Sequence, residues 1–259
     1  MTAPSPNRRW FVLARANPQA RLRLFCFPYA GGGASVFRLW ASEMPSQIEL
    51  VAIQPPGREA RLSEKAFTQM EPYVQSLAQQ MHVYADKPFA FFGHSLGARV
   101  SFELARYLRQ NSMPAPVQLF VSGNPAPQVP NPDPPIYHLP DAEFIRELRG
   151  YNGTPNEVLE HEELMELLLP TLRADFELHD TYTYMSDEPL DCPIFAFGGL
   201  RDSDVSQEDL TAWRKQTRGS FNVRMFPGDH FFLHTERTQL IRAVSQDILM
   251  WLSRSGGHR

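Results

Sequence analysis

The amino-acid sequence predicts an α/β fold in which a mostly parallel sheet carries helices on both faces. Short apolar runs alternate with helix-like segments along most of the 259 residues. The turn Gly93–Gly97 joins one of these runs to a helix-compatible segment. Residues 137–185 show only a helical apolar period, so we expect a helical insertion there. Together these observations predict one domain over residues 1–259, with the insertion as a lid.

Composition limits the class of protein. Hydrophobic residues make up 42% of the chain and charged residues 21%, which is typical of a soluble globular protein. The net charge of −4 provides no basic field for nucleic acid or an anionic membrane. No apolar run approaches the roughly 18 residues of a membrane span. Residues 1–9 are polar and lack a signal-peptide core. Cys26 and Cys192 lie in apolar runs, as buried free thiols do, so we expect a cytoplasmic protein.

The first half of the chain predicts four strands and a long helix. Residues 21–27 alternate at first and then become wholly apolar, which indicates a strand that is exposed only at its beginning. Residues 69–84 repeat apolar side chains every three or four positions, which predicts a helix packed on the core. The predicted strands cover residues 10–15, 21–27, 49–53 and 89–92.

The second half continues the alternation after the proline-rich loop 123–135, in which six of thirteen residues are proline. Such a segment predicts a semi-rigid connection that leaves the sheet. The polarity of residues 221–226 alternates, as expected of a strand at a sheet edge. The predicted strands here are 117–122, 193–197 and 221–226, and helices follow at 206–216 and in the C-terminal region.

The turn Gly93–Gly97 has the pattern G-x-S-x-G, with Ser95 at its centre. An apolar strand before it and a helix after it are the context of a nucleophile elbow, which lifts a serine hydroxyl to the top of a sheet. Glycines flank the serine because the turn is too sharp for side chains. The alternative is an ordinary strand-to-helix turn with a capping serine.

A glycine-rich loop follows the second predicted strand, at residues 28–35. A phosphate-binding loop would need a lysine after the glycines, and none is present. The favoured interpretation is a loop that supplies a backbone N–H to an oxyanion hole, where glycine lets the main chain approach the substrate.

A serine nucleophile needs a base and an orienting acid, which on this fold follow it in the order serine, acid, histidine. His230 lies in a glycine-containing loop directly after a predicted strand, whereas its competitor His234 falls beside the next helix. Asp202 follows the strand 193–197, with Asp204 as its main rival. Either carboxylate could instead cap the helix 206–216. Asp229 is poorly placed to reach the ring of its own neighbour.

At this point the chain resembles a known family over nearly its whole length. Six motifs in order are similar to those of type II thioesterases, the stand-alone editing hydrolases of polyketide and nonribosomal peptide synthesis. Asp229 stands where relatives frequently have glycine. The motifs are Phe27–Ser35, Pro56–Glu59, Gly93–Gly97, Leu169–Phe176, Gly199–Asp202 and Gly228–Leu233.

The resemblance implies an α/β-hydrolase core with a helical lid. It also implies hydrolysis of stalled acyl groups on the phosphopantetheine arm of acyl or peptidyl carrier domains, by a monomer without cofactor or metal. By position, Ser95 matches the nucleophile, Asp202 the acid and His230 the base, and the N–H groups of Ala30 and Leu96 match the oxyanion hole. Two alternatives remain open: an esterase or lipase acting on free esters, and a non-catalytic protein on a hydrolase scaffold.

The charge is unevenly distributed. Residues 137–185 contain eleven acidic and three basic residues, a net −8, which leaves +4 for the rest of the chain. Because the family's carrier partners are acidic, we expect a carrier to dock on the core side, near Arg58, Arg61 or Arg99. The alternative is that the acidic residues form a solvated helix face.

Overall fold

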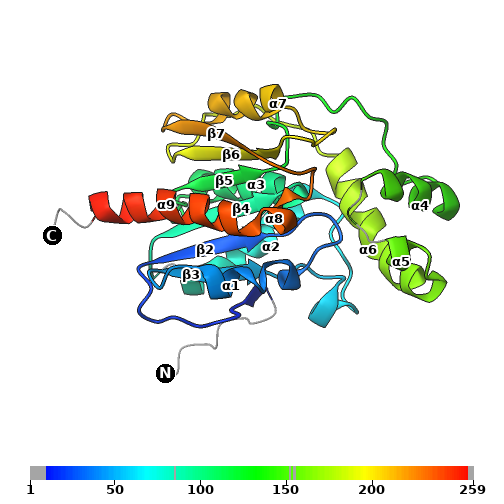
Figure 1. Cartoon of the computed structure of the whole chain (residues 1–259), viewed down its shortest axis with the longest axis horizontal. Coiled ribbons are helices and arrows are strands. Elements are labelled where there is room, and N and C mark those ends of the chain that lie inside the picture. Colours follow the sequence, from blue (N-terminus) through cyan, green and yellow to red (C-terminus); the bar gives the residue numbers. More distant parts are fainter. Residues whose placement is uncertain (1–9, 85, 152, 154–155, 256–259) are drawn as a thin grey trace.

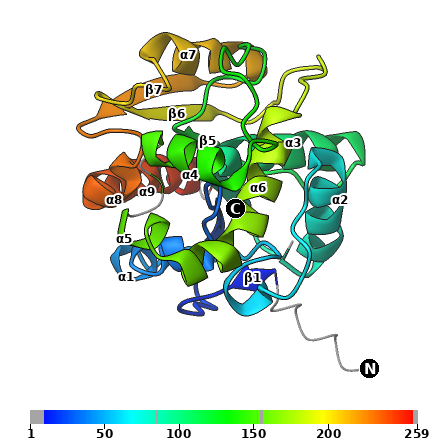
Figure 2. The same ribbon diagram turned by 90° about the vertical axis from the view of Figure 1, so that its right-hand side faces the viewer.

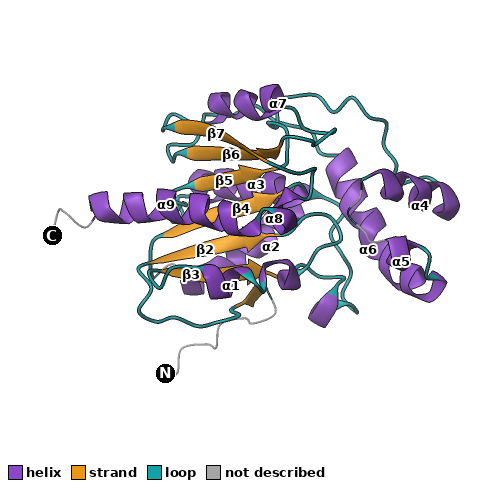
Figure 3. Ribbon diagram, in the orientation of Figure 1, coloured by secondary structure: helices purple, strands orange, loops and turns teal. Residues whose placement is uncertain are grey.

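The computed structural model describes residues 10–84, 86–151, 153 and 156–255. Residues 1–9 and 256–259 of the predicted domain, and 152, 154 and 155 of the predicted insertion, lie outside the described residues. One sheet of seven strands, ordered β1-β3-β2-β4-β5-β6-β7, forms the centre (Figure 3). The strands are β1 (Phe11–Val12), β2 (Leu22–Phe27), β3 (Ile48–Ile53), β4 (Phe89–His94), β5 (Leu119–Ser122), β6 (Ile194–Gly199) and β7 (Phe221–Phe226).

All neighbouring strands in this sheet are parallel except the edge pair β1 and β3. The mostly parallel α/β fold is therefore confirmed. Every residue of β3, β4 and β5 is buried, as a parallel sheet covered on both faces requires. β7, predicted from its alternating polarity to lie near an edge, is the edge strand opposite β1.

Helices cover both faces of the sheet (Figure 1). Apolar side chains of α2 and α3 belong to one buried cluster, whereas those of α1 and α9 belong to the other. No helix among the described residues is long and apolar enough to cross a membrane. The helices are α1 (Trp40–Glu43), α2 (Met70–Met81), α3 (Leu96–Gln110), α4 (Asp141–Gly150), α5 (Asn156–Leu159), α6 (Glu162–Asp180), α7 (Gln207–Thr211), α8 (Phe232–Thr235) and α9 (Arg237–Ser255).

Some predicted elements are shorter than their apolar patterns. The strand predicted at 10–15 pairs only at β1, because only Phe11 and Val12 find partners on β3. The helix predicted at 69–84 is α2 followed by a 3-10 turn, His82–Tyr84. The helix at 206–216 is likewise α7 followed by a 3-10 turn, Ala212–Gln216. In each case the apolar pattern gives the type of element more reliably than its ends.

The chain between β5 and β6 forms α4, α5 and α6, which we call the helical insertion. Figure 2 shows these helices in front of one end of the sheet, the end from which the loops with Gly31 and Ser95 emerge. The insertion has a small apolar cluster of its own, including Phe144, Met165 and Leu172. Pro170 lies within α6 and removes one backbone donor from that helix.

Candidate active site

Ser95 occupies a strained turn between β4 and α3. Its backbone has φ 53° and ψ −122°, a conformation that L residues rarely adopt and that marks functional turns. The flanking glycines are required sterically. A Cβ on Gly93 would lie 2.2 Å from the Gly97 carbonyl oxygen, and a Cβ on Gly97 would lie 2.2 Å from that of Phe27. Ser95 makes no side-chain capping bond to α3, which argues against the capping alternative.

His230 and Asp202 meet behind this turn. Nδ1 of His230 lies 2.9 Å from Oδ2 of Asp202, whose side chain is fully buried. The other oxygen, Oδ1, accepts hydrogen bonds from the N–H groups of Asp204 (2.9 Å) and Val205 (3.2 Å). Three hydrogen bonds thus position the carboxylate, and it in turn fixes the orientation of the imidazole.

The rival residues have other partners. The Asp204 side chain is exposed and accepts a hydrogen bond from Ser203 Oγ at 2.9 Å. Nε2 of His234 lies 3.0 Å from the Tyr29 hydroxyl, and burial, with a smaller contribution from Arg237, lowers the pKa of His234. Asp229 accepts from the N–H group of Phe231, two residues on. The structure therefore brings Asp202, rather than its rivals, against His230.

Asp202, Asp204 and His230 could each offer one atom to a metal ion, since these atoms lie within 4.8 Å of one another. However, Nδ1 of His230 and both oxygens of Asp202 already have hydrogen-bond partners within the protein. A metal would have to displace these bonds.

A cavity of about 270 Å³ connects the predicted groups. Ser95 and His230 line it together with Ala30 and Leu96, and Asp202 lies behind His230. Leu96 is the first residue of α3, where backbone N–H groups have no partner within the helix. Tyr151 and Phe176 add aromatic surface from the side of the insertion. The cavity thus offers a hydroxyl, an imidazole and helix-terminal N–H groups to one bound molecule.

His94 lies next to Ser95 in sequence but takes no part in lining this cavity. It is buried, and its Nδ1 is 2.9 Å from Ser122 Oγ. Burial, with smaller contributions from the charges of His230 and His234, holds the pKa of His94 well below its usual value. Its ring centre lies 5.2 Å from that of His230. Because its neutral form is favoured, His94 places no positive charge beside the ring of His230.

The glycine-rich loop is held by the insertion. Oδ2 of Asp175, on α6, accepts a hydrogen bond from the N–H group of Gly31 at 2.6 Å. The same carboxylate forms a buried, two-point ion pair with Arg58, at 2.5 and 2.8 Å. Burial acts to lower the pKa of Arg58, but Asp175 outweighs it and the net pKa is raised. Arg58 also donates to the carbonyl of Gly32 at 3.3 Å, so α6 is fastened to the loop directly and through Arg58.

The three arginines predicted to receive a carrier are buried, so their place in the docking prediction is wrong, while the approach from the core side stays a prediction. Arg58, Arg61 and Arg99 are only 6%, 6% and 7% exposed. Arg58 pairs with Asp175, while Arg61 pairs with Glu64 at 2.6 Å and lies over the ring of Trp10. Arg99 lines the cavity described above. Counting charges in the sequence overlooked this burial, because partners such as Arg58 and Asp175 are 117 positions apart.

Sequence reasoning missed the role of Asp175 and Arg58. Asp175 was counted among the acidic residues of the insertion, although its side chain is 7% exposed and paired. A signal was present: both residues fall within motifs of the family resemblance, Pro56–Glu59 and Leu169–Phe176. Each motif contains one member of an oppositely charged pair, so the two motifs could have been expected to meet in the folded chain.

The sheet and the serine turn between β4 and α3 are those of the α/β-hydrolase class. A family model described as the thioesterase domain matches residues 22–248. The chain therefore belongs to the thioesterase family.

Relatives agree with this family. The gramicidin S biosynthesis protein GrsT of Aneurinibacillus migulanus is 49% identical over 98% of this chain and 99% of its own. Among solved structures, the type II thioesterase BorB from the borrelidin biosynthetic cluster has a TM-score of 0.83 and 33% identity, covering 92% of this chain and 96% of its own. The RedJ thioesterase from the prodiginine pathway of Streptomyces coelicolor has a TM-score of 0.83 and 36% identity, covering 89% and 92%. The resemblance to type II thioesterases is confirmed.

Proposed function

We propose that this thioesterase hydrolyses stalled or aberrant acyl groups from the phosphopantetheine arm of carrier domains in polyketide or nonribosomal peptide synthesis. The main support is the site geometry: Ser95 on a strained turn shares a cavity with His230, which is hydrogen-bonded to the buried Asp202. GrsT is named as a gramicidin S biosynthesis protein, and BorB and RedJ as thioesterases of borrelidin and prodiginine biosynthesis, which supports a role in a biosynthetic pathway.

In the proposed mechanism, His230 removes the proton of Ser95 through Nε2 while the hydroxyl attacks the thioester carbonyl. Asp202 holds the ring by Nδ1 and stabilises its charged form. The N–H groups of Ala30 and Leu96 stabilise the developing oxyanion. The C–S bond breaks as the acyl-enzyme forms, and the leaving pantetheine sulfur, whose thiol has a pKa of about 8.5 for comparable thiols, takes the proton from His230. Water, deprotonated by His230, then releases the acid and restores Ser95.

The remaining features of the proposal follow from this assignment. The chain acts as one α/β-hydrolase domain, residues 1–259, whose lid is the insertion at about 137–185. It works as a monomer in the cytoplasm. It needs no cofactor or metal, since the triad supplies nucleophile, base and acid. Its partners are acyl or peptidyl carrier domains, which present the thioester.

The test is hydrolysis of acyl groups from loaded carrier proteins, followed by mass spectrometry. We expect Ser95→Ala to lower turnover about 10⁴-fold or more, with the fold retained. His234→Gln is the matched control and should leave turnover within a few-fold. Near-normal turnover by Ser95→Ala would contradict the assignment. A strong preference for simple oxygen esters would favour an esterase, and failure of a fluorophosphonate to label Ser95 would favour a non-catalytic protein.

A further inference from the structure

A buried arginine lies one helical turn beyond the candidate nucleophile. Arg99 follows Ser95 by four positions on α3 and is 7% exposed. Residues four apart on a helix lie on the same face, and Arg99 lines the same cavity as Ser95 and His230. A positive charge therefore borders the space in which an acyl group would lie.

The polar contacts of Arg99 are few. Its Nη1 donates to the carbonyl of His179 at 3.2 Å, and its guanidinium lies 4.8 Å from the centre of the Tyr182 ring. Its Nε is buried and has no hydrogen-bond partner. Among the described residues, no carboxylate lies within 4.0 Å of the guanidinium nitrogens. Arg99 is thus a buried cation that lacks an anion.

The carboxylates nearest to Arg99 have other partners. Glu103 accepts two hydrogen bonds from Arg106, at 2.8 and 3.0 Å, and one from the Tyr182 hydroxyl at 2.6 Å. Asp180 lies 3.1 Å from Nδ1 of His179 and accepts from the N–H group of Ile136 at 2.9 Å. Both carboxylates act to raise the pKa of Arg99 against the larger effect of burial, but neither forms an ion pair with it within 4.0 Å.

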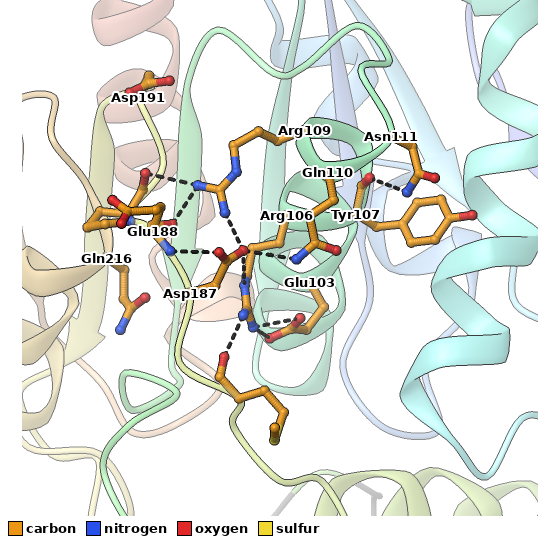
Figure 4. Close-up of polar contacts among 12 residues, drawn as sticks. Glu103, Arg106, Tyr107, Arg109, Gln110, Asn111, Asp187, Glu188, Asp191 and Gln216 are labelled. Atoms are coloured by element: carbon orange, nitrogen blue, oxygen red, sulfur yellow. Dashed lines mark hydrogen bonds and ion pairs between the residues drawn. The ribbon is translucent and has the colours of Figure 1, made fainter.

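Two other arginines on α3 provide a contrast. Figure 4 shows Arg106 paired with Glu103, and Arg109 bonded to Asp187. Both therefore have the carboxylate partner that a buried or half-buried arginine normally requires. Arg99 alone of these three faces the cavity, and it alone lacks such a partner.

The remaining charges on the cavity wall do not neutralise Arg99 in this way. Asp133 and Asp204 are exposed, so solvent screens them. Asp209 is engaged with Ser206 in the capping box of α7. Burial lowers the pKa of Arg99, but an arginine side chain keeps its proton in proteins.

We propose that Arg99 binds a carboxylate on the acyl group of the substrate, so that the enzyme favours thioesters of dicarboxylic acids such as malonyl and succinyl groups. This inference rests on the proposed function. Four residues of helix rise by about 6 Å, so the anion must lie a few bonds from the carbonyl that Ser95 attacks. The phosphate of the phosphopantetheine arm lies at the opposite end of that arm and is too distant. The planar guanidinium suits a carboxylate, to which it can donate two parallel hydrogen bonds.

The experiment compares kcat/KM for succinyl and pentanoyl thioesters of N-acetylcysteamine, which have similar length and differ in charge. The wild-type enzyme should favour the succinyl thioester. Arg99→Met should reduce kcat/KM for the succinyl thioester about 10- to 100-fold, the range for a hydrogen bond to a charged group, with little change for the pentanoyl thioester. Arg99→Lys should retain part of the preference. The control Arg109→Met removes a paired arginine outside the cavity and should leave the ratio unchanged.

The ratio of the two kcat/KM values does not depend on the fraction of folded enzyme, so it remains informative if a variant is unstable. Should Arg99→Met fail to fold, Arg99→Lys is the test: a reduced preference for the succinyl thioester supports the inference, and an unchanged ratio contradicts it. A wild-type preference for the pentanoyl thioester, or a ratio unchanged in Arg99→Met, would overturn the inference. So would an effect of Arg99→Met seen only with phosphate-bearing carrier substrates.

The same experiment separates this inference from the proposed function. If loaded carrier proteins are hydrolysed without preference for a carboxylated acyl group, the role of Arg99 is wrong and the proposed function stands. If no acyl group is released from carrier proteins, the proposed function itself is wrong.

Discussion

The two sides of the candidate site are held in place by different parts of the molecule. Asp202 and His230 follow β6 and β7, and backbone N–H groups of the same loop fix the carboxylate of Asp202. The glycine-rich loop with Ala30 follows β2, but its N–H group at Gly31 is fixed by Asp175 of the insertion. One side therefore depends on the sheet, and the other depends on the docking of α6.

Because the two sides are held differently, substitutions should affect acid–base chemistry and the support of the glycine-rich loop separately. A change on the sheet side should remove acid–base chemistry without disturbing α6. A change at the contact between α6 and the glycine-rich loop should weaken oxyanion stabilisation and stability together, because that contact includes a buried ion pair. The following substitutions test this division.

The largest effect is expected on the sheet side. Asp202→Asn should lower kcat about 10⁴-fold, because the amide no longer holds the imidazole in the tautomer that accepts a proton from Ser95. Steady-state kinetics with a carrier-bound thioester measure it. The matched control Asp204→Asn should change kcat less than a few-fold, since that side chain is exposed and accepts its hydrogen bond from Ser203 Oγ, whereas Asp202 is the carboxylate bonded to Nδ1 of His230. Equal losses in the two variants would contradict the assignment of Asp202.

Asp175→Asn is expected to lower kcat less than Asp202→Asn does, and to lower the free energy of unfolding as well. The amide can still accept from the N–H group of Gly31, but it leaves the buried charge of Arg58 unpaired. We expect a loss of about 3–5 kcal/mol in the free energy of unfolding, measured in urea. We also expect a 10- to 100-fold lower kcat, which is less than removal of an oxyanion donor would cost.

The double variant Arg58→Met/Asp175→Leu separates these two losses. Apolar replacement of a whole buried pair is often neutral, so stability should largely return. Leucine at position 175 also removes the acceptor for the N–H group of Gly31, so kcat should be no higher than in Asp175→Asn. Full recovery of kcat along with stability would show that the contact acts only on folding.

The smallest effect is expected for Gly31→Ala. Gly31 has φ +78°, and a Cβ there would lie 2.7 Å from Cδ2 of Leu172 on α6. We expect about 1–3 kcal/mol of destabilisation and a kcat lowered roughly tenfold. Adding Leu172→Ala should relieve the clash but not the backbone strain, giving partial recovery. Gly150→Ala is the control, because a Cβ on Gly150 would meet nothing within 4 Å, and it should be neutral or slightly stabilising.

Local patterns were sufficient for much of the fold and for the acid–base side of the site. The strand before Ser95, the glycines around it and the loops with Asp202 and His230 are each defined within a few residues of sequence. Their meeting follows from parallel strands, whose carboxyl ends lie along one edge of the sheet. The structure places these residues together as that rule requires, and their catalytic roles stay a prediction.

The contacts of charged residues were not predictable in the same way. Asp175 meets Arg58 and Gly31 across 117 and 144 positions, and no local period encodes such a meeting. The same limitation misassigned Arg99, because a charged residue on an amphipathic helix is normally exposed. In this chain it lines a cavity whose wall includes Phe176 and His179 of α6, far along the sequence.

Pro170 has a consequence for engineering this enzyme. The part of α6 after Pro170 contains Thr171, which donates to the carbonyl of Gly57, and Asp175, which binds Gly31. The part before it, with α4 and α5, makes neither contact. A chimaera that exchanges the whole insertion to alter acyl selectivity would also discard the support of the glycine-rich loop. A crossover placed at Pro170 would exchange Tyr151 of the cavity wall, retain Phe176 and His179, and keep that support intact.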